Sequence, residues 1–369
     1  MFGMSGRSLL VLAAWLAYGG LGGSAPAQDL RSELRAGKRL THGAAATLEE
    51  QVEEAPDNLA ARLRLIGYYY TQRLAKEPGG NFQRHLKSAM FDRWSAHLLW
   101  TIRNAPETDV LSQFECTIYK HGDEDTYTLA GAAWSQHLET MPRNLDVLKN
   151  AAEFYRSNDR TLAIEVFERI QVMDEANPLW ARELGDLYQR DMLGLVAGGG
   201  FNGPDPVAAA RALHQYERAY ELSGSGPEDP LLRYLAWTAW GSGQTSKARA
   251  YAEAMLRDRS DDRELGDRIH HGHLILGMIA LADGRLEEAT DHLLDAGRSP
   301  ESPRLYDRGP NMVLAQQLLE RGETETVVSY LELCSKFWLS GKGRRLLPMW
   351  VEMVEAGEIP IFGHNLLLR

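Results

Sequence analysis

Cysteine is nearly absent from this sequence: Cys116 and Cys334 are the only two in 369 residues. They form no Cys-x-x-Cys pair, so the spacing typical of structural zinc sites and of redox disulfides is missing. Because the two lie far apart along the chain, we expect two buried thiols; a bond between them in an oxidising compartment is the alternative. The composition therefore excludes a small domain held together by several disulfides.

The sequence also lacks an excess of basic residues. It has 40 Lys and Arg against 51 Asp and Glu, a formal net charge of -11. Neutralising a phosphate backbone requires clustered Lys and Arg. The charge balance therefore predicts that nucleic acid is not a partner. Hydrophobic residues make up 44% of the chain, which is enough for a sizeable core and argues against a disordered protein.

No apolar run reaches the roughly 20 residues that a membrane-spanning helix needs. The longest candidate, Leu9 to Tyr18, follows Arg7 and gives way to glycines, and Ala25-Pro26-Ala27 offers the small-x-small pattern of a cleavage site. We interpret residues 1–27 as a cleaved signal peptide, with an uncleaved anchor helix as the alternative. The expected location is periplasmic or secreted, with no integral membrane span after cleavage.

Motifs of catalysis are missing too. There is no Gly-x-Ser-x-Gly or His-Glu-x-x-His sequence, and the glycines between Gly194 and Gly200 lack the Lys of a phosphate-binding loop. His270, His271 and His273 form the densest histidine group, but no further ligand completes a metal site in the sequence. We therefore expect no enzyme activity, no cofactor and no metal. The alternative is an enzyme accessory or ligand-binding protein whose site combines the Gly-rich loop with the histidine group.

What the sequence does contain is a recurring pattern of short helices with small residues at fixed spacing. In its clearest copy, Leu276-Gly277 and Ala280 share one helical face, Gly284 interrupts the chain, and a second helix carries small and apolar residues three and four positions apart, namely Ala289, Leu293 and Ala296. Two helices approach closely only where side chains are small. The pattern predicts an antiparallel helix hairpin.

These residues resemble the tetratricopeptide repeat, and the export signal is typical of an exported bacterial member of that family. The resemblance implies an all-α fold, an α-solenoid of stacked antiparallel helix hairpins wound into a right-handed superhelix. The pattern recurs at Ile66-Gly67 with Tyr70; Ala151-Ala152 and Tyr155 with Ala163, Phe167 and Ile170; Leu184-Gly185 and Tyr188 with Ala212, Tyr216 and Ala219; Leu235-Ala236 and Ala239 with Ala248, Ala252 and Met255; and Leu314-Ala315 and Leu318 with Val327 and Leu331.

The repeats divide the chain into predicted segments. After the signal we expect a linker over 28–43, irregular repeats over 44–142 with an atypical first helix near Val110 to Lys120, and regular repeats over 143–342. A Gly-rich loop over 189–206 interrupts the regular repeats. Residues 343–369 are expected to form a capping helix at Leu346 to Glu355 and a partly extended tail.

A non-enzymatic scaffold or adaptor of the cell envelope is the function that this resemblance implies. Its partner, a protein or peptide, would lie in a concave groove lined by the first helix of each repeat, and self-association into a homo-oligomer is an alternative use of the surface. The polar half of the predicted groove contains Arg64, Tyr68, Asn150, Glu153, Arg182, Asp186 and Arg190, and the aromatic half contains Tyr234, Trp237 and Trp240. Burial of the aromatic half by packing is the competing interpretation.

Overall fold

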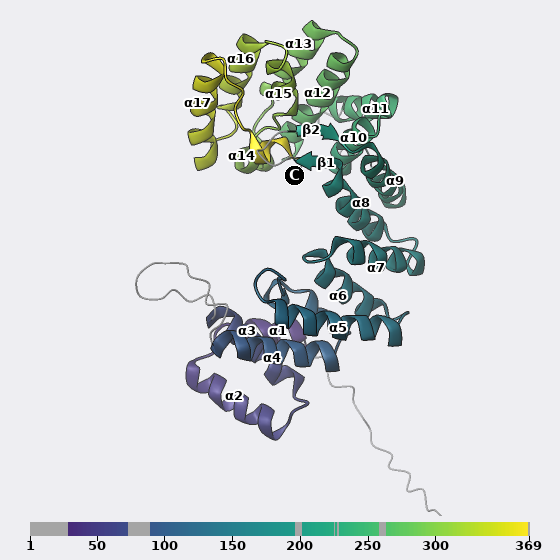
Figure 1. Ribbon diagram of the computed structural model, residues 1–369, viewed down its shortest axis with the longest axis vertical. Coiled ribbons are helices and arrows are strands. Elements are labelled where there is room, and N and C mark those ends of the chain that lie inside the picture. The colour runs from purple at the N-terminus through teal and green to yellow at the C-terminus, as the bar shows by residue number, and fades with distance from the viewer. Residues whose placement is uncertain are drawn as a thin grey trace, which may run out of the picture. The chain divides into compact units, whose positions relative to one another are not determined.

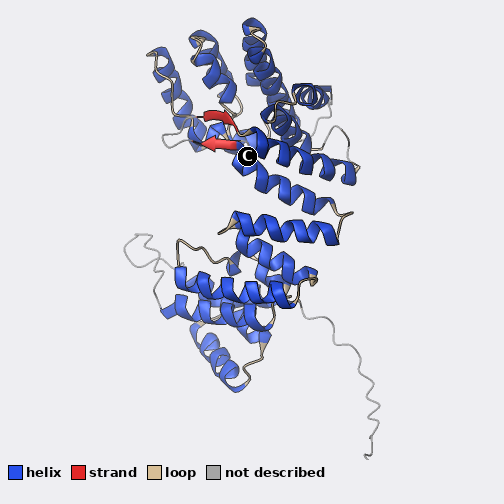
Figure 2. Cartoon of the chain, turned by 45° about the vertical axis from the view of Figure 1, so that its right-hand side comes forward, coloured by secondary structure: helices blue, strands red, loops and turns tan. Residues whose placement is uncertain are grey.

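The structure is a computed structural model that describes residues 29–72, 89–195, 201–224, 226, 229–257 and 263–367. Throughout these ranges the chain is built from α-helices that pack as antiparallel hairpins, with one short pair of strands (Figures 1 and 2). The predicted fold class, an all-α solenoid of stacked helix hairpins, is confirmed. The chain divides into two compact units, Met1–Thr101 and Ile102–Arg369.

The first unit contains a helix that the sequence analysis missed. Its helices are α1 (Leu30–Gly37), α2 (His42–Glu54), α3 (Leu59–Gln72) and most of α4 (Ala89–Asn104). Helix α1 packs on α3 so closely that a Cβ at Gly67 would lie 2.1 Å from the carbonyl oxygen of Leu34. The linker prediction for 28–43 is therefore wrong in this part. The charged composition of the stretch concealed one buried apolar side chain, that of Leu34.

The second unit is a linear succession in which each main helix packs on the next. After two 3₁₀ turns, η1 (Asp109–Ser112) and η2 (Phe114–Cys116), it continues with α5 (Glu124–Thr140), α6 (Leu145–Arg156), α7 (Arg160–Met173), α8 (Pro178–Met192), β1 (Leu193–Leu195), β2 (Phe201–Pro204), α9 (Pro206–Ser223), α10 (Leu231–Gly241), α11 (Thr245–Arg257), α12 (Leu265–Ala282), α13 (Leu286–Gly297), α14 (Pro303–Arg308), α15 (Val313–Leu319), α16 (Thr324–Cys334), α17 (Gly341–Glu355) and η3 (Gly363–Leu366).

Among the described residues of this unit, four helices end in the same turn. At the end of α12, Gly284 has φ of 77°, its N–H donates to Leu281, and the N–H of Arg285 donates to the carbonyl of Ala280 at 2.9 Å. This is a Schellman turn, which favours glycine because a side chain is strained at positive φ. Helices α10, α15 and α17 end in the same way at Gly243, Gly322 and Gly357. The repeat of the turn follows from the repeat of the sequence.

Helix starts are also encoded locally. The side chains of Asn144, Asp159, Asp205 and Ser302 accept backbone N–H groups in the first turns of α6, α7, α9 and α14, and a proline follows directly after the last two. Such residues satisfy N–H groups that the helix itself leaves without partners. The boundaries of the hairpins thus follow from short stretches of sequence.

The small residues of the predicted repeats lie where two helices meet. A Cβ at Gly185 of α8 would come within 2.6 Å of the ring of Tyr216 on α9. A Cβ at Gly277 of α12 would lie 2.4 Å from Cδ2 of Leu314 and 3.1 Å from Cβ of His292. Close packing at these positions confirms the predicted hairpins, since larger side chains would force the helices apart.

Three irregular segments differ from expectation. The atypical helix near Val110 to Lys120 is replaced by η1 and η2. In the segment 189–206, predicted to be a loop, α8 continues to Met192 and β1 pairs antiparallel with β2, while residues 196–200 lie outside the described ranges. The capping helix α17 begins at Gly341, earlier than predicted, and includes Pro348. The strands β1 and β2 were missed because they are short and contain glycine and proline, so the sequence carries no alternating apolar pattern that would indicate their pairing.

Cys116 and Cys334 are both buried and form no disulfide in the part of the chain that the structure describes, as predicted. Within the same ranges, none of the helices has the length and apolar character required to cross a bilayer. The predicted signal peptide, residues 1–27, lies outside the described residues.

Candidate binding site

Three residues predicted to line the groove are buried side chains with packing roles. Tyr68 lies in the core of the first unit, and its hydroxyl is 3.2 Å from Nδ1 of His42. Asn150 donates from Nδ2 to the carbonyls of Pro106 and Thr108, both at 2.8 Å. Trp237 is 0% exposed. These side chains do not face a partner, because the neighbouring helix or loop covers the face on which the periodicity placed them.

Other predicted groove residues are partly exposed but already engaged. Arg64 pairs with Glu33 in the first unit, and Glu153 is 3.2 Å from Arg156 on the same helix. Asp186 accepts the hydroxyl of Tyr216 at 2.7 Å. The Tyr234 ring lies beside Tyr216, and the Trp240 ring packs edge-on against Trp237. Two of the predicted residues, Arg182 and Arg190 of α8, are exposed side chains.

The predicted histidine group does not form one site. His270 is fully buried: its Nδ1 lies 3.0 Å from the carbonyl of Ala296, and its Nε2 accepts the N–H of Asn311. His271 is also buried, against Trp237. His273 contacts α13 at another place, where it meets His292. The proposed combination of the three histidines with the Gly-rich loop therefore has no support in the described residues, because consecutive positions on a helix face different neighbours.

A buried ion pair in the second unit joins Arg233 of α10 to Asp267 of α12. Nη1 of Arg233 donates to Oδ2 of Asp267, and their side chains are 3% and 6% exposed. Burial acts to lower the pKa of Arg233, but the attraction of Asp267 outweighs it, and the pKa is raised. Among the described residues, Nε and Nη2 of Arg233 and Oδ1 of Asp267 have no hydrogen-bond partner. The pair is thus charged and retains hydrogen-bonding capacity.

His271 completes this buried group as a neutral side chain. Nε1 of Trp237 donates to Nδ1 of His271 at 3.0 Å, so the proton of the ring is on Nε2, which lies 3.7 Å from Oδ1 of Asp267. Burial, together with the nearby positive charge of Arg233, holds the pKa of His271 well below its ordinary value. The ring therefore adds no positive charge at neutral pH.

A cavity of about 460 Å³ lies against Asp267 and His271. Its other charged walls come from α14 and α17 and carry more positive than negative charge: Arg304, Asp307, Arg308, Lys342 and Arg345. Nε of Arg304 is 3.5 Å from Oδ2 of Asp267, a carboxylate that Arg233 already neutralises. Burial and the repulsion of Arg233 lower the pKa of Arg304. The basic side chains of this lining outnumber its carboxylates, so an anion entering the cavity would meet a net positive charge.

Aromatic side chains form the far wall of this cationic cavity. Trp338 and Trp350 have ring centroids 5.6 Å apart, and Phe362 packs edge-on against Trp350 at 5.0 Å. Trp338 is enclosed by two glycines, since a Cβ at Gly309 or Gly343 would come within 2.3 or 2.6 Å of its ring. Its Nε1 has no hydrogen-bond partner within the described ranges, so this wall carries a buried donor as well as apolar surface.

The end of the chain closes one side of the cationic cavity. The N–H of Met312 donates to the carbonyl of Asn365 at 2.8 Å, and Nδ2 of Asn365 donates to Pro310 at 2.7 Å. Leu366 is 0% exposed. These contacts hold the segment 361–367 in place as a wall. Part of it, Gly363–Leu366, is the 3₁₀ helix η3, where the sequence analysis expected a partly extended tail.

Sequence reasoning missed this site, although a signal for it exists. The Arg233 to Asp267 and Trp237 to His271 contacts each span 34 residues, which is the length of one tetratricopeptide unit. Residues one repeat apart occupy equivalent positions in successive hairpins. Opposite charges at that spacing, on faces that the pattern assigns to the core, would have indicated a buried pair.

A polar cluster in the first unit is a structural clamp by comparison. The carboxylate of Glu49 accepts hydrogen bonds from the hydroxyl of Tyr69 at 2.5 Å and from Nη1 of Arg93 at 3.1 Å. Nε2 of His97 lies 3.2 Å from the same carboxylate. Burial acts to raise the pKa of Glu49, but these donors lower it overall. The cluster ties α2 to α3 and α4. Each of its four side chains already has a hydrogen-bonding partner within the cluster.

Comparison with known proteins yields likenesses in structure alone. No known protein family matches the chain, and no curated protein matches it in sequence. Among solved structures, the human IFIT1 dimer with m7Gppp-AAAA is similar at a TM-score of 0.41 and 16% identity, over 85% of this chain and 67% of that chain. The human IFIT1 dimer with PPP-AAAA is similar at 0.40 and 16% identity, over 87% and 69%.

These comparisons correct one prediction. Both IFIT1 structures contain an oligonucleotide, which contradicts the exclusion of nucleic acid as a partner on the ground of net charge. The physical reason is that -11 is a sum over the whole chain, whereas binding depends on local charge. A cavity lined by Arg304, Arg308, Lys342 and Arg345 is cationic whatever the total is.

Proposed function

We propose that this chain is a non-catalytic scaffold of the tetratricopeptide type that holds an acidic segment of a partner protein in the cationic cavity of its second unit. The observation that carries the proposal is the excess of positive charge at Arg304, Arg308, Lys342 and Arg345 around a cavity of about 460 Å³. A stretch of Asp and Glu side chains supplies the opposite charge.

Binding is favoured over catalysis by the state of the titratable groups in the cavity. The carboxylate of Asp267 is bound to Arg233, and the accepting nitrogen of His271 is taken by Trp237. A general base needs a lone pair directed at the substrate. The accepting nitrogen of His271 is not available in this way, and Asp267 keeps only Oδ1 without a hydrogen-bond partner among the described residues, on a carboxylate that Arg233 already holds between α10 and α12.

The arrangement of the cavity suits a carboxylate-bearing segment. Arg308, Lys342 and Arg345 are exposed at the surface, where they increase the rate of encounter with an anion. Arg304 lies deeper and is partly desolvated, so that a carboxylate beside it forms a stronger hydrogen-bonded pair. Ile361, which lines the cavity and is 69% exposed, adds apolar surface for the aliphatic or aromatic neighbours of the acidic side chains, while the buried rings of Trp338 and Trp350 support the wall behind it.

The test is a titration of the full chain with a fluorescent decapeptide of glutamate. A Lys342→Glu, Arg345→Glu double variant reverses two exposed charges of the cavity and should weaken binding at least tenfold. Arg344→Glu is the matched control, because Arg344 is an exposed neighbour on α17 that does not line this cavity. Equal affinity of the two variants would sink the proposal.

Three further probes decide the class of partner. A decapeptide of lysine should not bind, and the oligonucleotides PPP-AAAA and AAAA should bind more weakly than the glutamate peptide. Tighter binding of PPP-AAAA, lost in the Lys342→Glu, Arg345→Glu variant, would replace the acidic protein segment by a phosphorylated nucleic-acid end at the same cavity.

We further propose that the scaffold acts in the cell envelope after export. The support is the pattern of residues 1–27, with Arg7, the apolar run from Leu9 to Tyr18 and Ala25-Pro26-Ala27. Mass spectrometry of the protein from an expressing bacterium should show a chain that begins at Gln28. Recovery of a chain that begins at Met1 in the cytoplasm would overturn the export proposal and leave the binding proposal untouched.

A further inference from the structure

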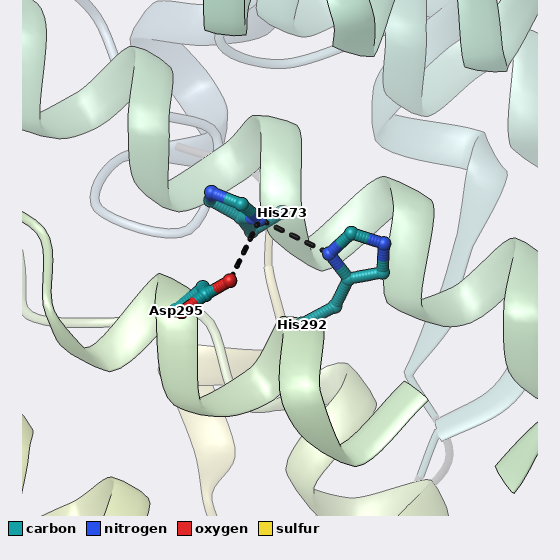
Figure 3. A group of neighbouring side chains, drawn as sticks. All are labelled: His273, His292 and Asp295. Carbon is teal, nitrogen blue, oxygen red and sulfur yellow. Dashed lines mark hydrogen bonds and ion pairs between the residues drawn. The ribbon is translucent and has the colours of Figure 1, made fainter. Parts of the chain in front are cut away.

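A cluster of metal-ligand side chains lies apart from the cationic cavity, between α12 and α13 (Figure 3). His273 comes from α12, and His292 and Asp295 come from α13. The two Nδ1 atoms of the histidines are 3.1 Å apart, and Nδ1 of His273 is 4.0 Å from Oδ2 of Asp295. One ligand atom from each of the three residues falls within 4.8 Å of the others.

The helix hairpin holds these three side chains together. His273 and Gly277 lie one turn apart on the same face of α12, and the missing side chain of Gly277 allows α13 to approach until the Cβ of His292 lies 3.1 Å from the position of a Cβ there. His292 and Asp295 are three residues apart and so share a face of α13. The ligands are therefore positioned by rigid elements, as a preformed metal site requires.

We propose that His273, His292 and Asp295 bind a divalent transition-metal cation of the Zn²⁺ type, with the fourth ligand position open to solvent. Zinc binds histidine nitrogen at about 2.0 to 2.1 Å with tetrahedral geometry, which places two nitrogen ligands roughly 3.3 Å apart. The nitrogens of His273 and His292 already have nearly this separation. A small rotation of Asp295 brings its oxygen from 4.0 Å to a similar distance.

The carboxylate of Asp295 also has a partner that orients it. Nη1 of Arg298, one turn further along, binds Oδ1 at 2.7 Å, while Oδ2 is the oxygen nearest His273. A charge-bearing donor on the outer oxygen of a ligating carboxylate is the usual second layer of a metal site. Two imidazoles and one carboxylate with an open position resemble in ligand type the three-ligand zinc sites, although the structure assigns no reaction to this one.

The test uses the full chain without a histidine tag, stripped with a chelator and titrated with Zn²⁺ and with Co²⁺. The parent should bind one equivalent of Zn²⁺ at micromolar or tighter affinity, and Co²⁺ should give the intense visible absorption of a four-coordinate site. His292→Gln and Asp295→Asn should each weaken Zn²⁺ binding at least tenfold, because each removes one of three ligands.

Matched controls separate this site from other histidines and carboxylates. His214→Gln on the exposed face of α9 and Asp291→Asn, one turn before Asp295 on α13, should leave the affinity unchanged. Far-ultraviolet circular dichroism shows whether each variant remains folded, and His273→Gln provides a second ligand variant if His292→Gln does not fold. A folded parent that binds no Zn²⁺ at 100 micromolar, or ligand variants that bind as well as the controls, would overturn the proposal.

Discussion

Arg233 and Asp267 occupy equivalent positions of successive hairpins, 34 residues apart, and form an ion pair that is almost fully shielded from solvent. Bringing two charges out of water costs several kcal/mol per ion, and only their attraction and further hydrogen bonds offset this cost. The pair therefore stabilises one alignment of α10 against α12 more than it stabilises folding as such. That alignment sets the wall of the cationic cavity.

Removing one charge of this buried pair should destabilise the protein far more than breaking an ion pair at the surface. Asp267→Asn leaves the buried guanidinium of Arg233 uncompensated, so the free energy of unfolding should fall by about 3 to 5 kcal/mol. Urea denaturation followed by circular dichroism measures it. The control is Asp191→Asn, which breaks the exposed pair with Arg160 and should cost less than about 1 kcal/mol. Equal losses in the two variants would show that the Arg233 to Asp267 pair is exposed in solution.

Trp237 should act in stability rather than in partner contact. Trp237→Ala empties a fully buried site and should cost about 3 to 5 kcal/mol, whereas Trp237→Phe chiefly leaves Nδ1 of His271 without its donor and should cost about 1 to 3 kcal/mol. Thermal unfolding of the parent, Trp237→Phe and Trp237→Ala should give melting temperatures that decrease in that order. If Trp237→Ala melts with the parent and loses only partner binding, the groove prediction for this residue was right after all.

The stability of the second unit should fall as the pH falls below neutrality. Burial lowers the pKa of His270 to about 4, below the ordinary value of about 6.5. Between these two values the unfolded chain binds a proton that the folded chain does not, so the free energy of unfolding decreases on acidification, by up to about 3 kcal/mol from this group. Above pH 6.5 the contribution is constant.

His270→Gln isolates that contribution from the titration of other groups. The glutamine amide can replace both contacts, to the carbonyl of Ala296 and from the N–H of Asn311. The shift of the urea midpoint between pH 7 and pH 5 should be smaller in this variant than in the parent. An identical shift in both proteins would mean that His270 titrates normally in the folded state.

Gly277 should tolerate no side chain. An alanine Cβ there would lie 2.4 Å from Cδ2 of Leu314 on α15, so Gly277→Ala should lower the free energy of unfolding by about 1 to 3 kcal/mol through overpacking between α12 and α15. Gly131→Ala in α5 is the matched control: its Cβ meets only Phe154 at 4.0 Å, and the better helix propensity of alanine should stabilise by up to about 1 kcal/mol. Urea midpoints of both variants decide the comparison. A stable Gly277→Ala protein would contradict the close packing of Leu314 of α15 against α12.

The sequence by itself determined the hairpins of this protein, because their causes are local. Gly277 and Gly185 mark where helices approach, Gly284 ends a helix by its positive φ, and Asn144 starts one by accepting backbone N–H groups. Each effect acts over a few residues, so spacing alone reveals it.

Only the tertiary structure decided which faces of those helices remain open. It buried Trp237 and Asn150, paired Arg233 with Asp267, separated His273 from its neighbours in sequence and placed it against His292. It also turned the expected linker into α1, which packs on Gly67. These outcomes depend on how far each hairpin is rotated against the next. That rotation is set by contacts between residues about 20 to 40 positions apart, which the local periodicity of the sequence does not reveal.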